Sequence, residues 1–305
     1  MILTVTLNTA LDVTHHVPKL IPHASHRVTT VTERAGGKGL NVARVLAALG
    51  HEVTATGFAG GRTGAVVREL LAGSPQVTDA LMPCAGATRR TLAVVDRASG
   101  NTTQFNEPGP LISSAEWAGF LSRYEALLAG AGAVALCGSL PPGVPVGAYA
   151  TLVRSARAAG VPVLLDTSGE ALRRGVAARP EMVKPNAAEL AELTGSCEPL
   201  QATRDARRRG AQAVVTSLGP EGLVAATAQG TWQAAPPRAL AGNPTGAGDS
   251  AVAGLLSALV EGLDWPDRLT RAVALSAATV TAPVAGEFDP RTYEQVRGSV
   301  KVTAH

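Results

Sequence analysis

The residues best placed to do chemistry stand in the segment Thr245-Gly-Ala-Gly-Asp-Ser250, which precedes the apolar run 251–260. This pattern predicts a glycine-rich loop that opens a helix. Backbone N–H groups and the positive end of the helix dipole would meet there and bind an anion. A carboxylate beside a bound phosphate is unfavourable, unless it accepts the proton of a hydroxyl that attacks the phosphoryl group. The segment therefore suggests phosphoryl transfer, with Asp249 as the base.

Two other interpretations of this segment remain open from the sequence. Asp249 could simply favour a helix N-terminus, as carboxylates do at ordinary helices. The run from Gly246 to Ala251 also matches the Gly-x-Gly-x-x-Ala pattern of dinucleotide-binding loops. That match lies near the C-terminal end and not after a first strand, and Asp249 would repel a pyrophosphate. Dinucleotide binding is the weaker of the two.

A second glycine cluster, Ala35-Gly-Gly-Lys-Gly-Leu-Asn41, also joins an extended segment to a helix. It differs from a Walker A loop because Gly39 follows Lys38 where Ser or Thr is required. As a substrate site, the glycines would let a sugar lie against the backbone, while Lys38 and Asn41 supply hydrogen-bond donors. A plain glycine turn before a helix is the simpler alternative.

The elements that must position these loops follow an alternating pattern. Short apolar strands at 133–137, 161–166 and 213–217 are separated by helical stretches, which is typical of a parallel sheet with helices on both faces. Two β-branched regions lack a helix and predict antiparallel hairpins. We expect one α/β domain over 1–305, with a small β-sheet lid inserted at about 12–35 and 87–108. An uncovered apolar face of this sheet could serve as a lid, a dimer contact or both.

Several polar residues gain meaning beside the two loops, because ligands of open α/β sheets collect at the carboxyl ends of the strands. Asp12 follows the first strand and could accept bonds from sugar hydroxyls, although it could equally be a turn residue. Arg27 and Arg90 lie on the lid strands, where a phosphorylated substrate would need cations. The remaining candidates follow later strands and are Ser139, Asn186, Glu189, Ser217 and Gly219.

Composition excludes several other classes of function. The net charge is +3 and the pI is near 9.0, yet aromatics make up only 3% and no basic run exceeds Arg207–Arg209, so nucleic acid is not expected. Three scattered cysteines argue against a disulfide framework or a zinc site. The uncharged run 126–153 contains three prolines and reads as a strand and turn, not a membrane span. Without an export signal, the expected compartment is the cytoplasm.

Taken together, the motifs resemble the ribokinase-like carbohydrate kinases, or PfkB family, over nearly the whole chain. The details are most similar to its 1-phosphofructokinase and tagatose-6-phosphate kinase branch. The matching segments are Thr6–Asn8 with Ala10–Asp12, Gly36–Gly39 with Asn41, Asn106–Gly109, Gly138–Gly143, Lys184–Asn186 with Glu189, and Thr245–Ser250. One departure is Thr9, where the branch commonly has proline, and we expect it to loosen the turn before Asp12 modestly.

The resemblance implies a three-layer α/β/α sandwich with a mostly parallel central sheet, and a β-lid that pairs two subunits into a homodimer. It also implies a role for each candidate residue. Asp249 is the base, and the N–H groups of Gly246, Ala247 and Gly248 form the anion hole. Sugar hydroxyls are held by Asp12, Gly37, Lys38 and Asn41, and the sugar phosphate by Arg27, Arg90, Lys38 and Ser139. The ATP site is lined by Lys184, Asn186, Ser217, Gly219 and Gly222, with Glu189 holding Mg²⁺ through water.

The reaction implied is transfer of a phosphoryl group from ATP to a hydroxyl of a ketohexose monophosphate. Fructose 1-phosphate, giving fructose 1,6-bisphosphate, is the first expectation, and tagatose 6-phosphate and fructose 6-phosphate are alternatives. The cations Arg27, Lys38 and Arg90 argue against an unphosphorylated sugar. A non-catalytic sugar-phosphate-binding regulator is the alternative from a different class. Asp249 argues against it, since binding alone would be better without a carboxylate there.

Overall fold

The large sheet of the protein contains the apolar strands that the sequence predicts at 133–137, 161–166 and 213–217, together with further strands. The computed structural model describes residues 1–240, 242–282 and 284–305. In spatial order the strands are β15 (Lys301–Ala304), β14 (Thr231–Ala235), β13 (Leu223–Ala226), β12 (Ala213–Ser217), β11 (Met182–Val183), β10 (Val163–Asp166), β9 (Ala133–Cys137), β1 (Ile2–Thr6), β4 (Val53–Gly60) and β5 (Val77–Asp79), and β6 (Met82–Cys84) also pairs with β4. Pairings from β5 across to β12 are parallel, and those from β12 to β15 are antiparallel.

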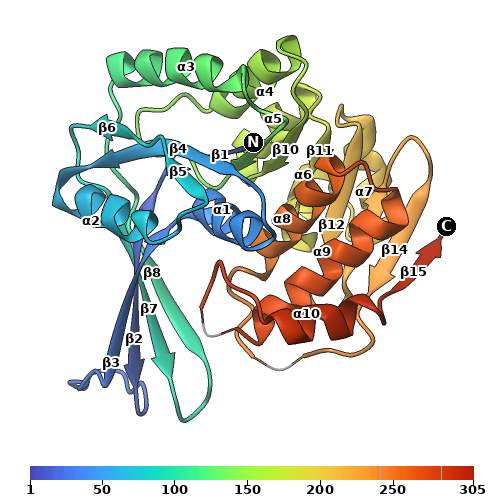
Figure 1. Ribbon diagram of the computed structural model, residues 1–305. Helices are drawn as coiled ribbons and strands as arrows, with labels where there is room; N and C mark the ends of the chain where they lie inside the picture. Colours follow the sequence, from blue (N-terminus) through green and yellow to red (C-terminus); the bar gives the residue numbers. More distant parts are fainter. Residues whose placement is uncertain (241, 283) are drawn as a thin grey trace.

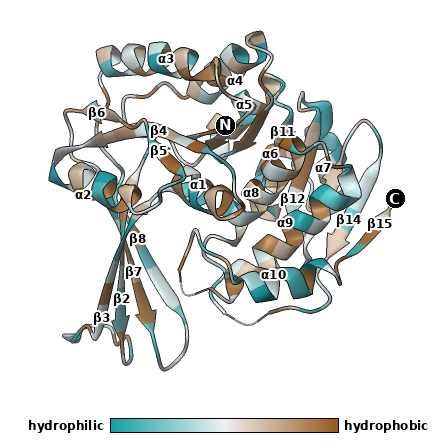
Figure 2. Ribbon diagram, viewed as in Figure 1, coloured by the Kyte–Doolittle hydropathy of each residue, from teal (hydrophilic) through white to brown (hydrophobic). Residues whose placement is uncertain are grey.

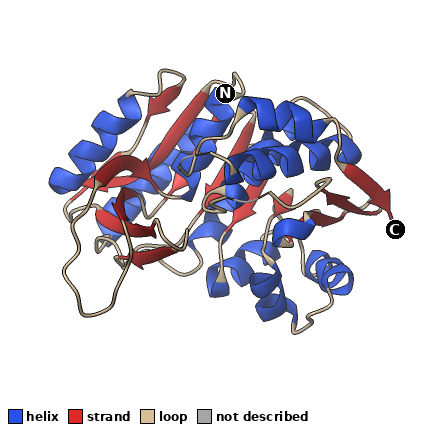
Figure 3. Cartoon of the chain, turned by 90° about the horizontal axis from the view of Figure 1, so that it is seen from below, coloured by secondary structure: helices blue, strands red, loops and turns tan. Residues whose placement is uncertain are grey.

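Helices cover both faces of this sheet, as Figures 1 and 3 show. One face carries α1 (Lys38–Ala48), α2 (Gly61–Ala72), α8 (Ala247–Val260), α9 (Trp265–Val280) and α10 (Pro290–Arg297). The other carries α3 (Ser114–Leu128), α4 (Ala148–Ala158), α5 (Gly169–Ala177), α6 (Ala187–Thr194) and α7 (Pro199–Arg208). Strand residues alternate between the two cores, because successive side chains of a strand point to opposite faces. In β9, Ala135 faces the first helix layer and Leu136 the second. The predicted three-layer sandwich is confirmed.

The two β-branched regions form a separate small sheet beneath the large one (Figure 1). Its strand order is β3 (Thr30–Gly36), β2 (Ala10–Val17), β7 (Arg89–Asp96) and β8 (Thr102–Asn106). The pairs β2–β3 and β7–β8 are antiparallel hairpins, and β2 joins β7 in parallel. We call this sheet the lid.

The two faces of the lid differ in chemistry, since residues along each strand alternate. Register places Thr14, Thr32 and Thr91 on one face, which also carries Asp12. The opposite face carries Val31 and Phe105, whose exposed fractions are 55% and 58%. Figure 2 shows the corresponding alternation of polar and apolar segments along these strands. The lid therefore turns a polar face to one side and an unpaired apolar face to the other.

Chain topology brings the starts of two helices together at the carboxyl edge of the sheet. Helix α1 follows β3 after Gly37, and α8 follows Gly246; the two helices pack against each other. Within the described ranges, no helix is long and apolar enough to cross a bilayer.

Candidate functional site

Asp249 lies in the first turn of α8, where the helix dipole is positive. Gly246, the residue just before this helix, adopts a left-handed conformation with φ 84°. A Cβ there would lie 2.9 Å from Ala285 Cβ. Glycine is therefore required at that position. The carboxyl group of Asp249 is buried, and Asn41 Nδ2 donates a hydrogen bond to its Oδ2 at 2.7 Å. This bond brings the two glycine-rich segments of the sequence together.

Burial raises the pKa of Asp249 to about 6, and the neighbouring charge of Asp166 adds to the effect. The positive charge of Lys38, the hydrogen bond from Asn41 and the charge of Lys184 oppose the rise. A carboxyl group with this pKa is a stronger base than an ordinary aspartate, yet it is still ionised at neutral pH. That is the property a general base needs.

Asp166 is a site residue that the sequence analysis missed. It is the last residue of β10 and only 1% exposed, and its two oxygens lie 3.5 and 3.3 Å from Lys38 Nζ. Lys184 Nζ lies 3.5 Å from the same carboxylate. Asp166 therefore joins Lys38, in the glycine loop 35–41, to the buried Lys184, which directly follows the neighbouring strand β11. An acidic residue ending a predicted parallel strand was the available signal.

The carboxylate of Asp12 lies directly against Gly36, in the glycine loop 35–41. A Cβ added at Gly36 would come within 2.1 to 2.3 Å of its carboxyl atoms, so only glycine allows this approach. Burial raises the pKa of Asp12, and the hydrogen bond from Thr91 and the charge of Arg44 reduce the rise. Thr9, which stands where the branch commonly has proline, donates through its buried hydroxyl to the Phe58 carbonyl, a bond that proline could not make.

A cavity of about 510 Å³ opens beside Lys38 and Ser139, two of the residues assigned to the sugar phosphate. Arg89 lines it and donates through Nε to the Asn8 carbonyl at 3.2 Å. Arg90 points to the opposite side of β7; its side chain is 64% exposed and lies 3.4 Å from Glu107. The structure thus brings Arg89, not the predicted Arg90, to this cavity.

Arg27 lies apart from the cavities to which other predicted site residues contribute. It is exposed in the connection between β2 and β3, and it does not line the cavities of about 510, 450, 220 and 180 Å³. Within a single chain, the structure does not bring it to Lys38 and Ser139.

A second cavity, of about 450 Å³, gathers the residues assigned to the nucleotide. Its polar lining comes from loops that follow β11 and β12 and from the start of α8, while Leu223, Val273 and Val280 supply an apolar wall. The predicted residues that line it are Asn186, Ser217, Gly219, Gly222, Ala247 and Gly248. Lys184 lies beside it, with Nζ 3.6 Å from the position of a Cβ on Gly248. The N–H of Ala247, assigned to the anion hole, donates to the Pro244 carbonyl at 3.1 Å in this conformation.

Glu189 has a structural role at the start of α6. It accepts from the Asn186 N–H at 2.8 Å, while Asn186 Oδ1 accepts from the Glu189 N–H at 2.9 Å, which is a capping box. Glu189 also lines the cavity that holds Lys38. Among the described residues, no cluster of three metal-ligating side chains exists, so any cation there would keep water ligands.

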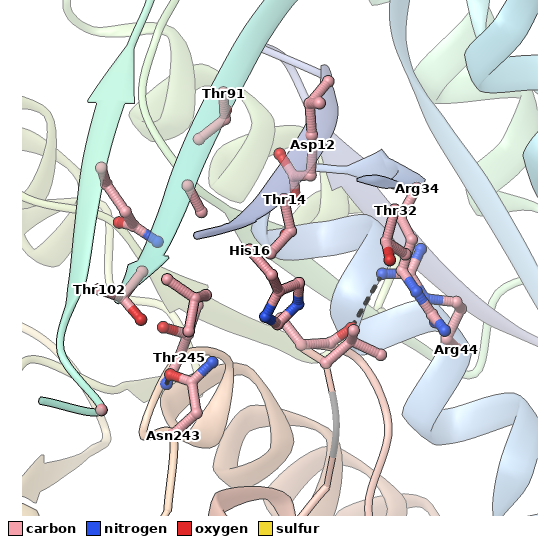
Figure 4. Close-up of a pocket in the computed structure, with 17 residues that line it drawn as sticks. Asp12, Thr14, His16, Thr32, Arg34, Arg44, Thr91, Thr102, Asn243 and Thr245 are labelled. Atoms are coloured by element: carbon pink, nitrogen blue, oxygen red, sulfur yellow. Dashed lines mark hydrogen bonds between the residues drawn. The ribbon is translucent and has the colours of Figure 1, made fainter. Parts of the chain in front are cut away.

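A third cavity, of about 180 Å³, lies between the polar face of the lid and the segment before α8. Figure 4 shows Asp12, Thr14 and His16 of β2 facing Asn243 and Thr245 across it. Arg44 of α1 closes one side and donates to the Ala285 carbonyl at 3.4 Å. The lid therefore faces the site with hydroxyl groups.

Comparison with known proteins agrees with this geometry. The sequence profile described as pfkB family carbohydrate kinase matches residues 4–291. A 1-phosphofructokinase of Rhodobacter capsulatus is 40% identical over 295 residues, which cover 95% of this chain and 92% of that protein. The chain therefore belongs to the pfkB family of carbohydrate kinases.

Solved structures give the same result. Phosphofructokinase-2 from Escherichia coli, in complex with potassium, superimposes with a TM-score of 0.90 at 30% identity and 98% coverage of both chains. The tetrameric inhibited form of that enzyme gives 0.88 at 31% identity, again with 98% of both chains covered. A possible 1-phosphofructokinase from Thermotoga maritima gives 0.89 at 27% identity, covering 100% of this chain and 99% of that one.

The raised pKa of Asp249 predicts that this residue destabilises the protein at neutral pH. In the unfolded chain the carboxyl ionises near its ordinary pKa of 3.8, whereas in the folded protein it ionises near 6. The folded state holds the proton more tightly, so stability falls as pH rises through that window. Asp249→Asn should therefore be more stable than wild type at pH 7.5, by about 2 to 3 kcal/mol. Denaturant unfolding at pH 4 and pH 7.5 measures this, and a difference that does not shrink at pH 4 would contradict it.

Proposed function

We propose that the protein transfers a phosphoryl group from ATP to a hydroxyl of a ketohexose monophosphate, with fructose 1-phosphate as the first candidate substrate. The observation that carries the proposal is the buried carboxylate of Asp249 at the start of α8. Gly248, one residue before it, lines the cavity with the apolar wall. Lys38, whose charge acts on Asp249, lines the cavity with Arg89 and Ser139. The base thus stands where two ligands of different chemistry would meet.

The cavity that contains Lys38 suits the anionic substrate. Lys38 and Arg89 supply two cations, and Ser139 a hydroxyl, all facing one space of about 510 Å³. Guanidinium and ammonium groups are the usual partners of a phosphate. The sugar hydroxyls then reach toward Asp12, Gly37 and Asn41, with one hydroxyl beside Asp249. On this basis Arg89 takes the place that the sequence assigned to Arg90.

The cavity with the apolar wall suits ATP. Its lining of Ser217, Gly219 and Gly222 leaves backbone exposed for hydrogen bonds, while the apolar wall accepts a base. Its inner end is the start of α8, where Gly246, Ala247 and Gly248 would receive the transferring group. Lys184 and Asn186 lie on the same side. Where ATP is the donor, Mg²⁺ held by Glu189 through water would neutralise phosphate charge. The cytoplasm, where ATP is abundant, is the expected compartment.

Asp166 fits this reaction as the residue that positions both lysines. Its carboxylate sits between Lys38 on the sugar side and Lys184 on the nucleotide side. It raises the pKa of Lys38, so that this lysine stays protonated. One buried acid thereby keeps a cation directed to each substrate.

A substrate panel tests the reaction. With ATP, wild type should phosphorylate fructose 1-phosphate faster than tagatose 6-phosphate or fructose 6-phosphate, while fructose and ribose should be poor substrates. Asp249→Asn should lower kcat by about 10² to 10⁴, because a general base is lost. Coupled assays of ADP release measure both. Activity on none of the phosphorylated sugars would favour a non-catalytic sugar-phosphate-binding protein, and normal turnover by Asp249→Asn would remove its role as base.

Adjacent arginines provide a matched test of the sugar-phosphate site. Arg89→Ala should raise KM for the sugar phosphate by about 10-fold or more, since a charge-assisted hydrogen bond is worth roughly 1.5 to 3 kcal/mol. Arg90→Ala should change KM by less than about threefold, because exposed ion pairs contribute little. Steady-state kinetics at saturating ATP compares the two. A larger effect in Arg90→Ala would reverse the assignment.

We also infer that two copies pair through the apolar face of the lid. Val31 and Phe105 expose apolar surface there, and an unpaired apolar sheet face is a common contact for another chain. The homologous Escherichia coli enzyme is described in a tetrameric form, which supports self-association. Arg27 lies in the connection between β2 and β3, four residues before Val31, and we assign it to the partner's sugar-phosphate site.

Charge placed on the lid should separate the subunits. Phe105→Asp should shift the wild-type dimer to a monomer in sedimentation velocity at micromolar concentration, because burying an unpaired carboxylate opposes association. Leu111→Asp is the matched control, since Leu111 is 71% exposed but lies outside the lid strands. A wild-type protein that sediments as a monomer, or equal effects of the two variants, would contradict this interface.

A further inference from the structure

Arg44 connects the glycine loop 35–41 to the segment 285–286, yet the proposed reaction gives it no role. It lies on α1, one turn after Asn41, and its Nη2 donates to Asn41 Oδ1 at 2.5 Å. Its Nη1 donates to the carbonyl of Ala35, the first residue of the glycine loop 35–41, at 2.5 Å. The side chain is partly buried and its Nε fully so.

The bond from Arg44 decides which end of the Asn41 side chain faces Asp249. A guanidinium only donates, so it takes the amide oxygen, and an ionised carboxylate only accepts, so it takes the amide nitrogen. The distances of 2.5 Å from Arg44 and 2.7 Å to Asp249 match this order. Without the guanidinium, the amide is free to turn its oxygen toward Asp249, which would repel the carboxylate.

The same guanidinium also supports the start of α8. It fills the space beside Gly286, where a Cβ would lie 2.6 Å from Nη2, and it reaches the Ala285 carbonyl at 3.4 Å. Ala285 in turn packs against Gly246, the residue that caps α8. The segment 285–286 is therefore held between Arg44 and the proposed anion hole.

Packing alone does not favour an arginine at position 44, because burying its guanidinium there is energetically unfavourable. Its Nε has no hydrogen-bond partner in the described part of the chain, and a buried unpaired donor is unfavourable. Burial and the charge of Arg34 lower the pKa of Arg44 to about 10. An apolar side chain would avoid both penalties, although it could not orient Asn41.

We propose that Arg44 is a positioning residue, which orients the Asn41 amide toward Asp249 and fixes segment 285–286 under the start of α8. The proposal rests on Asp249 being the base of the proposed reaction. Other charges near Asp249 are Lys38 of α1, Asp166 at the end of β10 and Lys184 after β11, none of which contacts Arg44 in the described hydrogen bonds and ion pairs.

The test is to titrate Asp249 directly, by carbon NMR of its carboxyl group, in wild type, Arg44→Lys and Arg44→Met. Arg44→Lys keeps the charge but loses the forked donor geometry, so it isolates orientation from charge. We expect the pKa of Asp249 to rise in both variants, and more in Arg44→Met. We also expect kcat to fall by about 10- to 100-fold with both KM values changed less than about threefold, as for small misplacements of a reacting group.

Arg68→Lys is the matched control. Arg68 also anchors a helix to a loop carbonyl, donating to Leu81 at 2.5 Å and to Asp79 at 2.6 Å, but it lies far from Asp249 in the fold. It should leave the Asp249 titration and kcat unchanged. A loss of kcat in Arg44→Lys without a change in the Asp249 titration would overturn the proposal, since it would indicate a merely structural role.

Wild type alone supplies a test that needs no variant. If the Asn41 amide donates to Asp249, its side-chain NH₂ resonances should shift as Asp249 titrates, and their independence of pH would overturn the proposal. The titration also separates this inference from the proposed function. Full turnover by Asp249→Asn would remove the base, whereas the NMR measurement judges Arg44 whether or not Asp249 is that base.

Discussion

The hydrogen bond between Asn41 and Asp249 joins the two halves of the site, and much of the molecule is arranged around it. It can form only if α1 and α8 start at the same edge of the sheet and pack side by side. Both helices start after a glycine with positive φ, at Gly37 and Gly246. Helix α1 follows the lid strand β3 on the way from β1 to the parallel strand β4, and α8 follows β14 at the antiparallel end of the sheet, so the two starts meet from distant parts of the chain.

Burying this carboxylate is unfavourable, and its surroundings offset only part of the penalty. The positive end of α8, the Asn41 amide and two lysines favour the ionised form, while desolvation and Asp166 oppose it. If the balance lay fully on the side of the lysines, Asp249 would be a weak base. If desolvation alone acted, it would be protonated at neutral pH. Asp166 contributes to the intermediate value, because it lies between the two lysines, partly neutralises their charge and adds a negative charge of its own.

Sequence reasoning identified the sheet, the lid hairpins and both glycine loops, because each depends on local patterns of residue type. It failed where the answer depended on register or on distant contacts. Arg89 and Arg90 are adjacent and identical in type, and only the pairing of β7 with β2 decides which one faces the cavity. Asp166 looked like an ordinary strand end, since Lys38 comes from a segment far away in the chain and Lys184 is brought close only by the pairing of β10 with β11. Glu189 caps α6 together with Asn186 and also lines the cavity that holds Lys38, and the capping pattern in the sequence describes only the first of these positions.

The lid shows how one small sheet can meet two requirements. Its polar face lines a cavity with hydroxyl groups, which Thr14, Thr32 and Thr91 supply on β-branched side chains that suit a strand. Its apolar face cannot also pack on the main domain, because the lid extends beyond it (Figure 1). An uncovered apolar sheet face of this kind leaves surface that another chain can bury. Covering that face with a second copy would therefore stabilise the same strands that complete the site, so that assembly and substrate binding would support each other through one element.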